Sequence, residues 1–156
     1  AAPTASLHFT RELASRLRIA TVTLHVGPGT FRPIRCERLA EHRLEAERFC
    51  VPEATASAIA ETRAAGGRVI AVGTTVVRAL ETTGGAAGAG DTALLVLPGH
   101  EFRAVDSLIT NFHLPGSSLL ALVMAFAGVE ATKRADAHAI AEKFRFFSYG
   151  DALWIR

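Results

Sequence analysis

Residues 68–83 read RVIAVGTTVVRALETT, and this stretch decides the fold class. Its first six residues have the length and composition of a short buried strand, and Gly73 separates them from a segment with helical spacing. A strand that passes directly into a helix is the unit from which α/β proteins are built. The stretch therefore predicts a strand over 68–73 and a helix over 74–83.

The segments on either side continue this alternation. Apolar, β-branched runs predict further strands at 19–26 and 92–97. Helical spacing, with an N-cap at Thr10 and another at Ser117 or Ser118, predicts helices over 11–18, 52–65, 117–127 and 131–144. Clusters of Gly and Pro predict loops at 27–33 and 84–90. We therefore expect an α/β layered domain with a mainly parallel or mixed sheet covered by helices.

Length and composition exclude several classes of protein. The chain has 156 residues, of which 49% are hydrophobic and 21% are charged, so it is long and apolar enough for one folded domain. The longest apolar run, 119–127, is about half of the roughly 20 residues that cross a bilayer, and no signal segment is visible. We expect a cytoplasmic protein without a membrane partner. Cys36 and Cys50 predict free thiols, and no residue spacing predicts a metal site.

The basic residues allow a nucleic acid partner without requiring one. The net charge is only +2, but Arg supplies all of the 17 basic residues except Lys133 and Lys143. Arg favours bidentate contacts with phosphate or carboxylate groups. The alternative is that a GC-rich genome accounts for the high Arg content, so composition alone locates no binding surface.

The first candidate site is the junction between the strand and the helix of the opening stretch. Gly73, Thr74 and Thr75 would place free backbone N–H groups and two hydroxyls at a helix start, where the helix dipole favours a carboxylate or phosphate. Ligands of open α/β sheets also gather at the carboxyl ends of the strands. The alternative is that Thr74 serves only as an N-cap.

The second candidate site is the loop after the strand at 19–26. His25 lies near the end of this strand, and Gly27, Gly29, Thr30 and Arg32 follow. Glycines would let the backbone approach a ligand closely, and an Arg could hold an anion. The alternative is an ordinary tight connection, which uses the same residue types.

The third candidate site is the segment that contains Asp106, Asn111 and His113. These polar residues are interleaved with apolar ones, which predicts the wall of a half-buried cleft. The alternative is that His113 is a satisfied core or turn residue. The segment 148–151, on spacing alone, predicts a turn packed on the core.

Five stretches of the sequence carry a resemblance to a known family. In order they are AAPTASLHFT (1–10), TLHVGPGTFRP (23–33), RVIAVGTTVVRALE (68–81), DSLITNFHLPGSSLL (106–120) and FRFFSYGDALWI (144–155). Together they resemble the S-adenosylmethionine:tRNA ribosyltransferase-isomerases of queuosine biosynthesis. The resemblance implies that the ribosyl group of S-adenosylmethionine is transferred to 7-aminomethyl-7-deazaguanine at the tRNA wobble position and isomerised. Epoxyqueuosine-tRNA would form, adenine and methionine would leave, and no metal would take part.

The resemblance also implies roles for single residues. A base must remove a proton next to the sulfonium, and a proton donor or polar pocket must help adenine depart. Arg32 and Arg35 would contact tRNA phosphates. The catalytic candidates, with no role assigned among them, are His8, His25, Asp106 and His113. The residues expected to bind substrate are Thr10, Gly27, Gly29, Thr30, Arg32, Gly73, Thr74, Thr75, Arg78, Asn111, Tyr149 and Asp151.

The resemblance assigns residues 1–156 to the C-terminal portion of the family's main α/β catalytic domain. An N-terminal segment and a small β-barrel domain of the family would be absent. Two other hypotheses stay open. The chain is either a divergent non-catalytic module that binds a nucleoside or tRNA, or an incomplete domain that folds by pairing with its missing N-terminal half or with itself.

Overall fold

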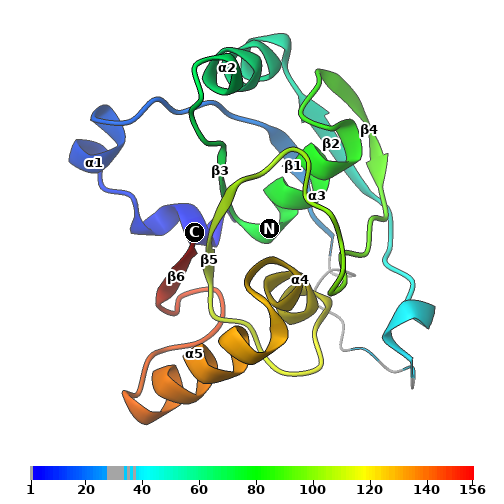
Figure 1. Ribbon diagram of the computed structural model, residues 1–156, viewed down its shortest axis with the longest axis vertical. Coiled ribbons are helices and arrows are strands. Elements are labelled where there is room, and N and C mark those ends of the chain that lie inside the picture. The colour runs from blue at the N-terminus through cyan, green and yellow to red at the C-terminus, as the bar shows by residue number, and fades with distance from the viewer. Residues whose placement is uncertain (1, 28–33, 35, 37) are drawn as a thin grey trace.

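The computed structural model of the chain describes residues 2–27, 34, 36 and 38–156 (Figure 1). The α-helices are α1 (Arg11–Ser15), α2 (Glu53–Ala64), α3 (Thr74–Thr83), α4 (Ser118–Ala127) and α5 (Val129–Ala141), and the 3-10 helices are η1 (Thr4–His8) and η3 (Leu39–Glu41). The strands are β1 (Thr23–His25), β2 (Glu47–Val51), β3 (Ile70–Val72), β4 (Gly88–Thr92), β5 (Ser107–Asn111) and β6 (Ala152–Ile155).

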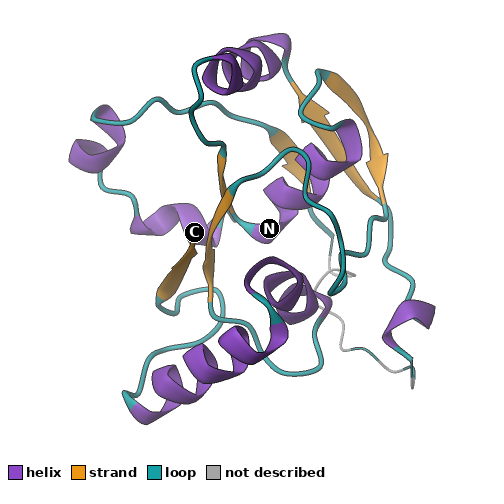
Figure 2. Ribbon diagram, viewed as in Figure 1, coloured by secondary structure: helices purple, strands orange, loops and turns teal. Residues whose placement is uncertain are grey.

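Within the described residues, these strands form two small sheets rather than one (Figure 2). The first has the order β1-β2-β4 and is antiparallel throughout. The second has the order β3-β5-β6, with β3 parallel to β5 and β6 antiparallel to it. The second sheet is therefore mixed, which confirms the predicted α/β class.

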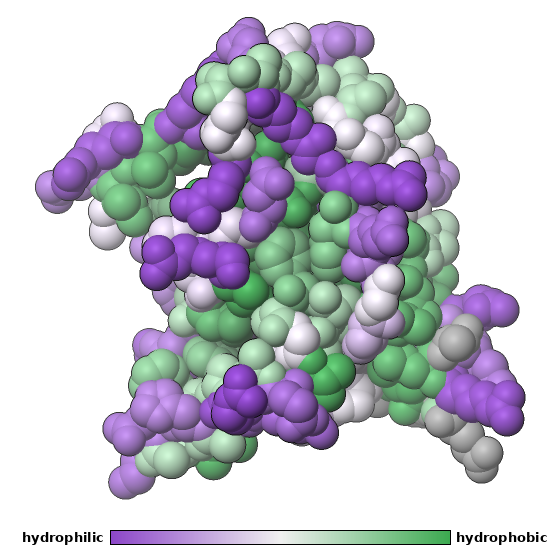
Figure 3. All heavy atoms as spheres, viewed as in Figure 1, coloured by the Kyte–Doolittle hydropathy of each residue, from purple (hydrophilic) through white to green (hydrophobic). Residues whose placement is uncertain are grey.

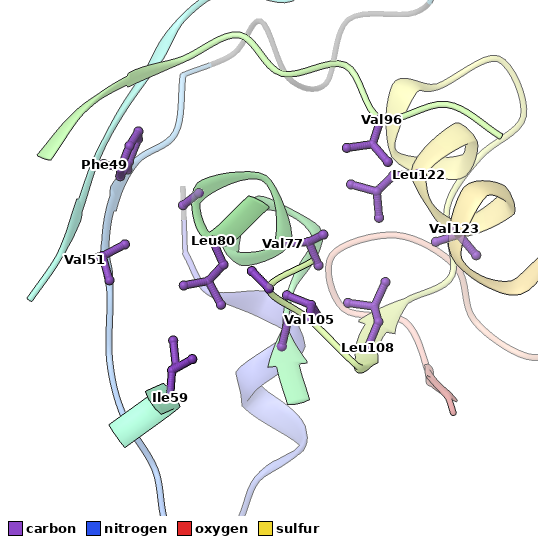
Figure 4. Packing of buried hydrophobic residues seen from close by; sticks show 13 residues of the cluster. Phe49, Val51, Ile59, Val77, Leu80, Val96, Val105, Leu108, Leu122 and Val123 are labelled. Carbon is purple, nitrogen blue, oxygen red and sulfur yellow. The ribbon is translucent and has the colours of Figure 1, made fainter. Parts of the chain in front are cut away.

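Helix α3 fills the space between the two sheets and α4. Figure 4 shows Val77 and Leu80 of α3 between Phe49 of β2 and Leu122 of α4, with Leu108 of β5 close by. Each of these five side chains is at most 5% exposed. Full burial of such a side chain contributes about 1.5–3 kcal/mol to the stability of the fold. Helix α3 is at the centre of the hydrophobic core because its buried side chains pack against both sheets and α4. The helical part of the 68–83 stretch is thereby fixed in place.

Gly73 makes the direct passage from β3 into α3 sterically possible. Its φ of 102° lies in the left-handed region, where a side chain is strained, and its N–H donates to the Ile109 carbonyl oxygen at 2.8 Å. Helix α3 then runs over the ten residues that the sequence predicts and ends at Gly84, whose φ is 64°. The same hydrogen bond ties the start of α3 to β5.

The structure confirms the predicted N-caps of α1 and α4, whereas α5 begins two residues before the predicted start at 131. Thr10 caps α1 by accepting a hydrogen bond from the Leu13 N–H at 3.1 Å. Ser117 caps α4 in the same way by accepting from the Leu120 N–H at 3.2 Å. Each cap satisfies one backbone donor that the first turn of a helix leaves free.

Two predicted elements are wrong. The segment 84–90 is not simply a loop, since its last three residues begin β4, and 92–97 is not a strand beyond Thr92. The reason is that β4 pairs with β2 through its backbone and needs no apolar side chains for this pairing. Val96 is 2% exposed, so part of this apolar run packs in the core without forming a strand. Strands β2, β5 and β6 were not predicted, and β2 lies in a charged stretch.

The surface has one extended apolar region in the view of Figure 1. Figure 3 shows apolar residues in the middle of this face, with hydrophilic residues over α2 and α5. Several large apolar side chains near the start of the chain are also exposed: Leu7, Leu13, Leu17 and Ile19. Within the described residues, every helix is too short or too polar to cross a membrane.

Candidate active site

The candidate site lies at the edge where the parallel strands β3 and β5 end. Gly73 and Thr74 follow β3, and Asn111 is the last residue of β5. The two strands are in register, with Val72 opposite Ile109, so both run out at the same edge of the sheet. Ligands of α/β proteins gather at this edge because the connections there leave polar backbone groups free. The structure thus brings together two of the three candidate sites of the sequence.

Asn111 connects three distant segments at this edge. Its side chain is buried, with the residue 4% exposed. Its Oδ1 accepts from the Thr4 hydroxyl at 3.3 Å, and its Nδ2 donates to the Gly150 carbonyl oxygen at 3.3 Å. The same Nδ2 lies 3.2 Å from Nε2 of His8. Helix η1, β5 and the turn before β6 therefore meet around one amide group, as Figure 1 shows for the elements.

The turn before β6 presents its backbone to Asn111. A Cβ atom at Gly150 would overlap the Arg145 carbonyl group, so this position accepts only glycine without rearrangement. The next residue, Asp151, accepts from the Arg145 backbone N–H at 2.8 Å and from its guanidinium at 3.3 Å. The backbone N–H of Arg145 lowers the pKa of Asp151 most, followed by the Arg145 side chain, with a smaller contribution from nearby His8. A carboxylate therefore lies next in the chain to Gly150, whose carbonyl oxygen contacts Asn111.

His113 lies just beyond β5 and is largely buried. Its Nε2 is 3.1 Å from the hydroxyl of Thr110, a residue that is 2% exposed. Burial lowers the pKa of His113 to about 4, because an apolar environment disfavours the charged imidazolium. His113 is therefore a neutral imidazole at physiological pH, and one of its ring nitrogens is held by Thr110.

The start of α3 contradicts one of the two interpretations of Thr74. Gly73 is the N-cap and Thr74 is the first helical residue, so the interpretation of Thr74 as the cap is wrong. Thr74 is 5% exposed, and Thr75 is half-buried. The N–H of Gly73 is used by Ile109, so an incoming anion would meet the backbone of the first helical turn. A role in binding stays a prediction for Gly73, Thr74 and Thr75.

The second candidate site is attached to the other sheet. His25 is exposed on β1, opposite Arg48 of β2, and Gly27 follows β1. Gly29, Thr30, Arg32 and Arg35 lie outside the described residues. The Ile34 backbone N–H donates to the Gly116 carbonyl oxygen at 2.9 Å, which joins the chain after this loop to the turn that follows His113.

Asp106 lies apart from the other catalytic candidates. It precedes β5, whereas Asn111 ends this strand, so the two residues are at opposite ends of β5. Its Oδ2 accepts from the Val69 backbone N–H at 2.7 Å, and its own N–H donates to the Val69 carbonyl oxygen at 2.9 Å. These bonds join the starts of β3 and β5, which is a structural role.

Arg78 is held inside the core by an ion pair. It is 2% exposed, and its guanidinium lies 2.7 Å from Glu47 and donates to the Leu94 carbonyl oxygen at 2.9 Å. Burial lowers the pKa of Arg78, and the neighbouring Glu47 opposes this effect. The pair joins α3 to β2, and the predicted contact of Arg78 with substrate stays untested. Among the remaining predicted residues, Thr10 caps α1 and Tyr149 is 79% exposed.

Sequence reasoning missed three members of this arrangement: Thr4, Thr110 and Gly150. Thr4 and Gly150 contact Asn111 across 107 and 39 residues, so local spacing could not reveal them. A weak signal existed for Gly150, which stands between two predicted residues, Tyr149 and Asp151. No group of three or more metal-ligating side chains is found in the part of the chain that the structure describes.

Comparisons with known proteins agree on one family. The sequence profile of a family described as queuosine biosynthesis protein matches residues 1–155. The S-adenosylmethionine:tRNA ribosyltransferase-isomerases of Thiobacillus denitrificans and Azoarcus sp. are 57% and 56% identical over 99% and 98% of this chain. The alignments cover 48% and 47% of these two relatives, so the chain spans about half their length.

A solved structure shows the same fold. The crystal structure of the S-adenosylmethionine tRNA ribosyltransferase from Thermotoga maritima superimposes with a TM-score of 0.80 and 42% sequence identity. The match covers 97% of this chain and 51% of that one.

Proposed function

This chain belongs to the family of queuosine biosynthesis proteins, and on that premise we propose that it forms part of the active site of an S-adenosylmethionine:tRNA ribosyltransferase-isomerase. Residues 1–156 would be the C-terminal portion of the main catalytic domain. The rest of a family-length protein would cover the apolar side chains exposed near the start of the chain, among them Leu13 and Leu17.

The proposed reaction moves one group and releases two. The ribosyl carbon next to the sulfonium of S-adenosylmethionine loses a proton to a base, and the aminomethyl nitrogen of 7-aminomethyl-7-deazaguanine in tRNA forms the new bond. The electron pair of the deprotonated carbon forms a carbon–carbon bond to the anomeric carbon, and adenine departs with the electron pair of its glycosidic bond and takes up a proton. The aminomethyl nitrogen, which loses a proton, displaces the ring oxygen from the anomeric carbon. This oxygen closes the epoxide at the carbon that carries the sulfonium, and methionine departs with the electron pair of its carbon–sulfur bond. The product would be epoxyqueuosine-tRNA.

One observation carries this proposal: the convergence of η1, the end of β5 and the 148–151 turn on Asn111. Three of the five stretches that carry the family resemblance meet there. Two imidazoles, His8 and His113, lie on this edge of the sheet, and both are candidates for proton transfer. The start of α3 is the place for the methionine carboxylate or the ribose hydroxyls.

Recognition of tRNA would use Arg32 and Arg35, as the family resemblance implies. These two residues flank the Pro33–Ile34 dipeptide in the sequence, and the Ile34 backbone N–H donates to the Gly116 carbonyl oxygen. Arg side chains would contact phosphates and orient the anticodon loop. A flipped wobble base would then enter the site, because chemistry on a base requires it to leave the stack.

A chimera tests the proposal in a protein of family length. This chain replaces the matching residues of the Thiobacillus denitrificans relative, to which it is 57% identical. We expect the chimera to release adenine when it is given S-adenosylmethionine and precursor tRNA. A folded chimera that binds S-adenosylmethionine by calorimetry but releases no adenine would instead favour a non-catalytic binding module.

A further inference from the structure

The hydrogen bonds of Asn111 determine the orientation of its amide group. The Gly150 carbonyl oxygen is an acceptor only, so the atom that faces it at 3.3 Å is the Nδ2 donor. The Thr4 hydroxyl then lies at 3.3 Å from Oδ1 and donates to it. An amide turned by 180° would place two oxygens against each other at Gly150. The orientation of Asn111 is therefore set by its buried neighbours.

This orientation places an N–H of Asn111 against His8. Nδ2 carries two hydrogens, and Gly150 takes one of them, so the other is available to Nε2 of His8 at 3.2 Å. A ring nitrogen that accepts a hydrogen bond has no proton of its own. In the neutral imidazole the proton then sits on Nδ1, because the bond at one ring nitrogen decides the state of the other.

We propose that Asn111 is a positioning residue that holds neutral His8 in the Nδ1–H tautomer, so that His8 offers substrate a hydrogen-bond donor rather than a base. His8 is exposed, and among the residues that the structure describes its Nδ1 has no hydrogen-bond partner. Its N–H would be available to the acceptor atoms of a ligand at the edge of the sheet. The inference rests on the proposed function for its catalytic meaning, whereas the tautomer itself is a property of the protein alone.

The Nδ1–H group of His8 would donate a hydrogen bond to a substrate atom that carries or gains negative charge. Oxygens of a carboxylate or hydroxyl and ring nitrogens of a departing nucleobase belong to this class. A hydrogen bond from Nδ1–H to such an atom stabilises negative charge without transfer of the proton. Proton abstraction then falls to another group, and His113, a neutral imidazole, is the candidate at this edge.

The tautomer is measured directly by nitrogen NMR on the chain with labelled histidine. The spectra are recorded at about pH 9, because an imidazole with the ordinary pKa of about 6.5 is neutral there. We expect a pyrrole-like signal for Nδ1 of His8 and a pyridine-like signal for its Nε2, with the signals assigned through His8→Gln. A pyrrole-like signal at Nε2 in the wild-type chain would overturn the inference.

Two variants separate positioning from general stability. Asn111→Asp replaces the donor with a carboxylate, so we expect His8 to change to the Nε2–H tautomer. Thr4→Val removes the bond to Oδ1 but keeps Gly150, so the tautomer should stay as in the wild type. A tautomer that is the same in all three proteins would also overturn the inference. If Asn111→Asp fails to fold, the wild-type and Thr4→Val spectra still decide the result.

Turnover in the chimera tests the catalytic meaning. Misplacement of a reacting group by about 1 Å can cost roughly a hundredfold in rate, so we expect a fall of that order in kcat for Asn111→Asp. KM for S-adenosylmethionine should change much less. An Nδ1–H tautomer in a chimera that releases no adenine would leave the positioning inference standing and reject the proposed function.

Discussion

Nδ2 of Asn111 lies 3.2 Å from Nε2 of His8, although 103 positions separate the two residues in the sequence. The contact joins the first helical turn of the chain to the end of the central strand of the second sheet. Gly150 completes the arrangement from the other end of the chain. The candidate site therefore depends on the whole fold, and substitutions at residues distant in sequence, such as Gly150, should alter the position of Asn111.

Gly150→Ala should destabilise the fold and disturb the site. A Cβ atom at this position would overlap the Arg145 carbonyl group, so the turn must move away from Asn111. Forced contacts of this kind cost about 1–3 kcal/mol. The matched control is Gly88→Ala, because a Cβ atom at Gly88 meets nothing within 4 Å. Equal midpoints of urea unfolding for the two variants would contradict the close approach at Gly150.

Removal of one partner from the Arg78–Glu47 ion pair should be strongly destabilising. Both side chains are buried, at 3% and 8% exposed, so removal of one partner leaves a charge that solvent hardly reaches and that has lost its counter-charge. We expect Glu47→Gln or Arg78→Met to lower the free energy of unfolding by about 3–5 kcal/mol. The double variant Glu47→Leu with Arg78→Met should lose less than the sum of the two single changes.

A surface ion pair provides the control for the variants of the Arg78–Glu47 pair. Arg48 and Asp91 lie 3.8 Å apart with side chains 73% and 58% exposed, so solvent screens their attraction. Asp91→Asn should change the free energy of unfolding by at most about 1 kcal/mol. If the buried pair behaved like this surface pair in urea titrations, Arg78 would not hold α3 to β2 as described.

His113 should make the protein less stable in acid. Its pKa in the folded protein is about 4, whereas an unfolded chain has the ordinary value of about 6.5. Between these values the unfolded state binds a proton that the folded state excludes, so stability falls as the pH drops from about 6.5 to 4. The loss from this group is up to about 3 kcal/mol. It is measured by urea unfolding at pH 7 and pH 4.5.

Two variants show whether His113 causes this loss. His113→Gln removes the titrating group, so the difference in stability between the two pH values should shrink. Thr110→Val removes the hydrogen-bond partner of the ring but leaves its burial, which is the cause of the lowered pKa. This variant should keep the acid loss, and a loss that is the same in His113→Gln would show that other groups produce it.

Asp106→Ala should lower the stability of the folded protein. The carboxylate accepts the Val69 backbone N–H and lies at the far end of β5 from Asn111. Loss of one such bond costs about 1–2 kcal/mol, so the midpoint of urea unfolding should fall. An unchanged midpoint together with lost adenine release in the chimera would return Asp106 to the catalytic role that the sequence suggests.

Local patterns predicted the parts of the fold that depend on neighbouring residues. Helix α3 and its end at Gly84 follow from the 68–83 stretch, and the caps at Thr10 and Ser117 follow from residue type. These features involve contacts within a few positions of the chain. Strand β4 was missed because its small residues carry no periodic signal and are ordered by pairing with β2.

The candidate site was predicted in its residues but not in its arrangement. Asn111 and His113 were selected from one motif and Gly73 from another, and parallel pairing of β3 with β5 brings the two motifs to one edge. Sequence spacing gave no reason to separate Asp106 from Asn111, because the length of β5 between them was unknown. The use of Arg78 in an internal ion pair could not be foreseen either, since its partner is 31 residues away.

The most direct test of the central claim is the stoichiometry of products from the chimera. One adenine and one methionine should be released for each precursor tRNA, and the modified nucleoside should gain the mass of the transferred ribosyl group. The parent relative from Thiobacillus denitrificans provides the reference rate in the same assay. A folded chimera that binds both S-adenosylmethionine and tRNA, yet leaves the tRNA mass unchanged and releases no adenine, would contradict the account.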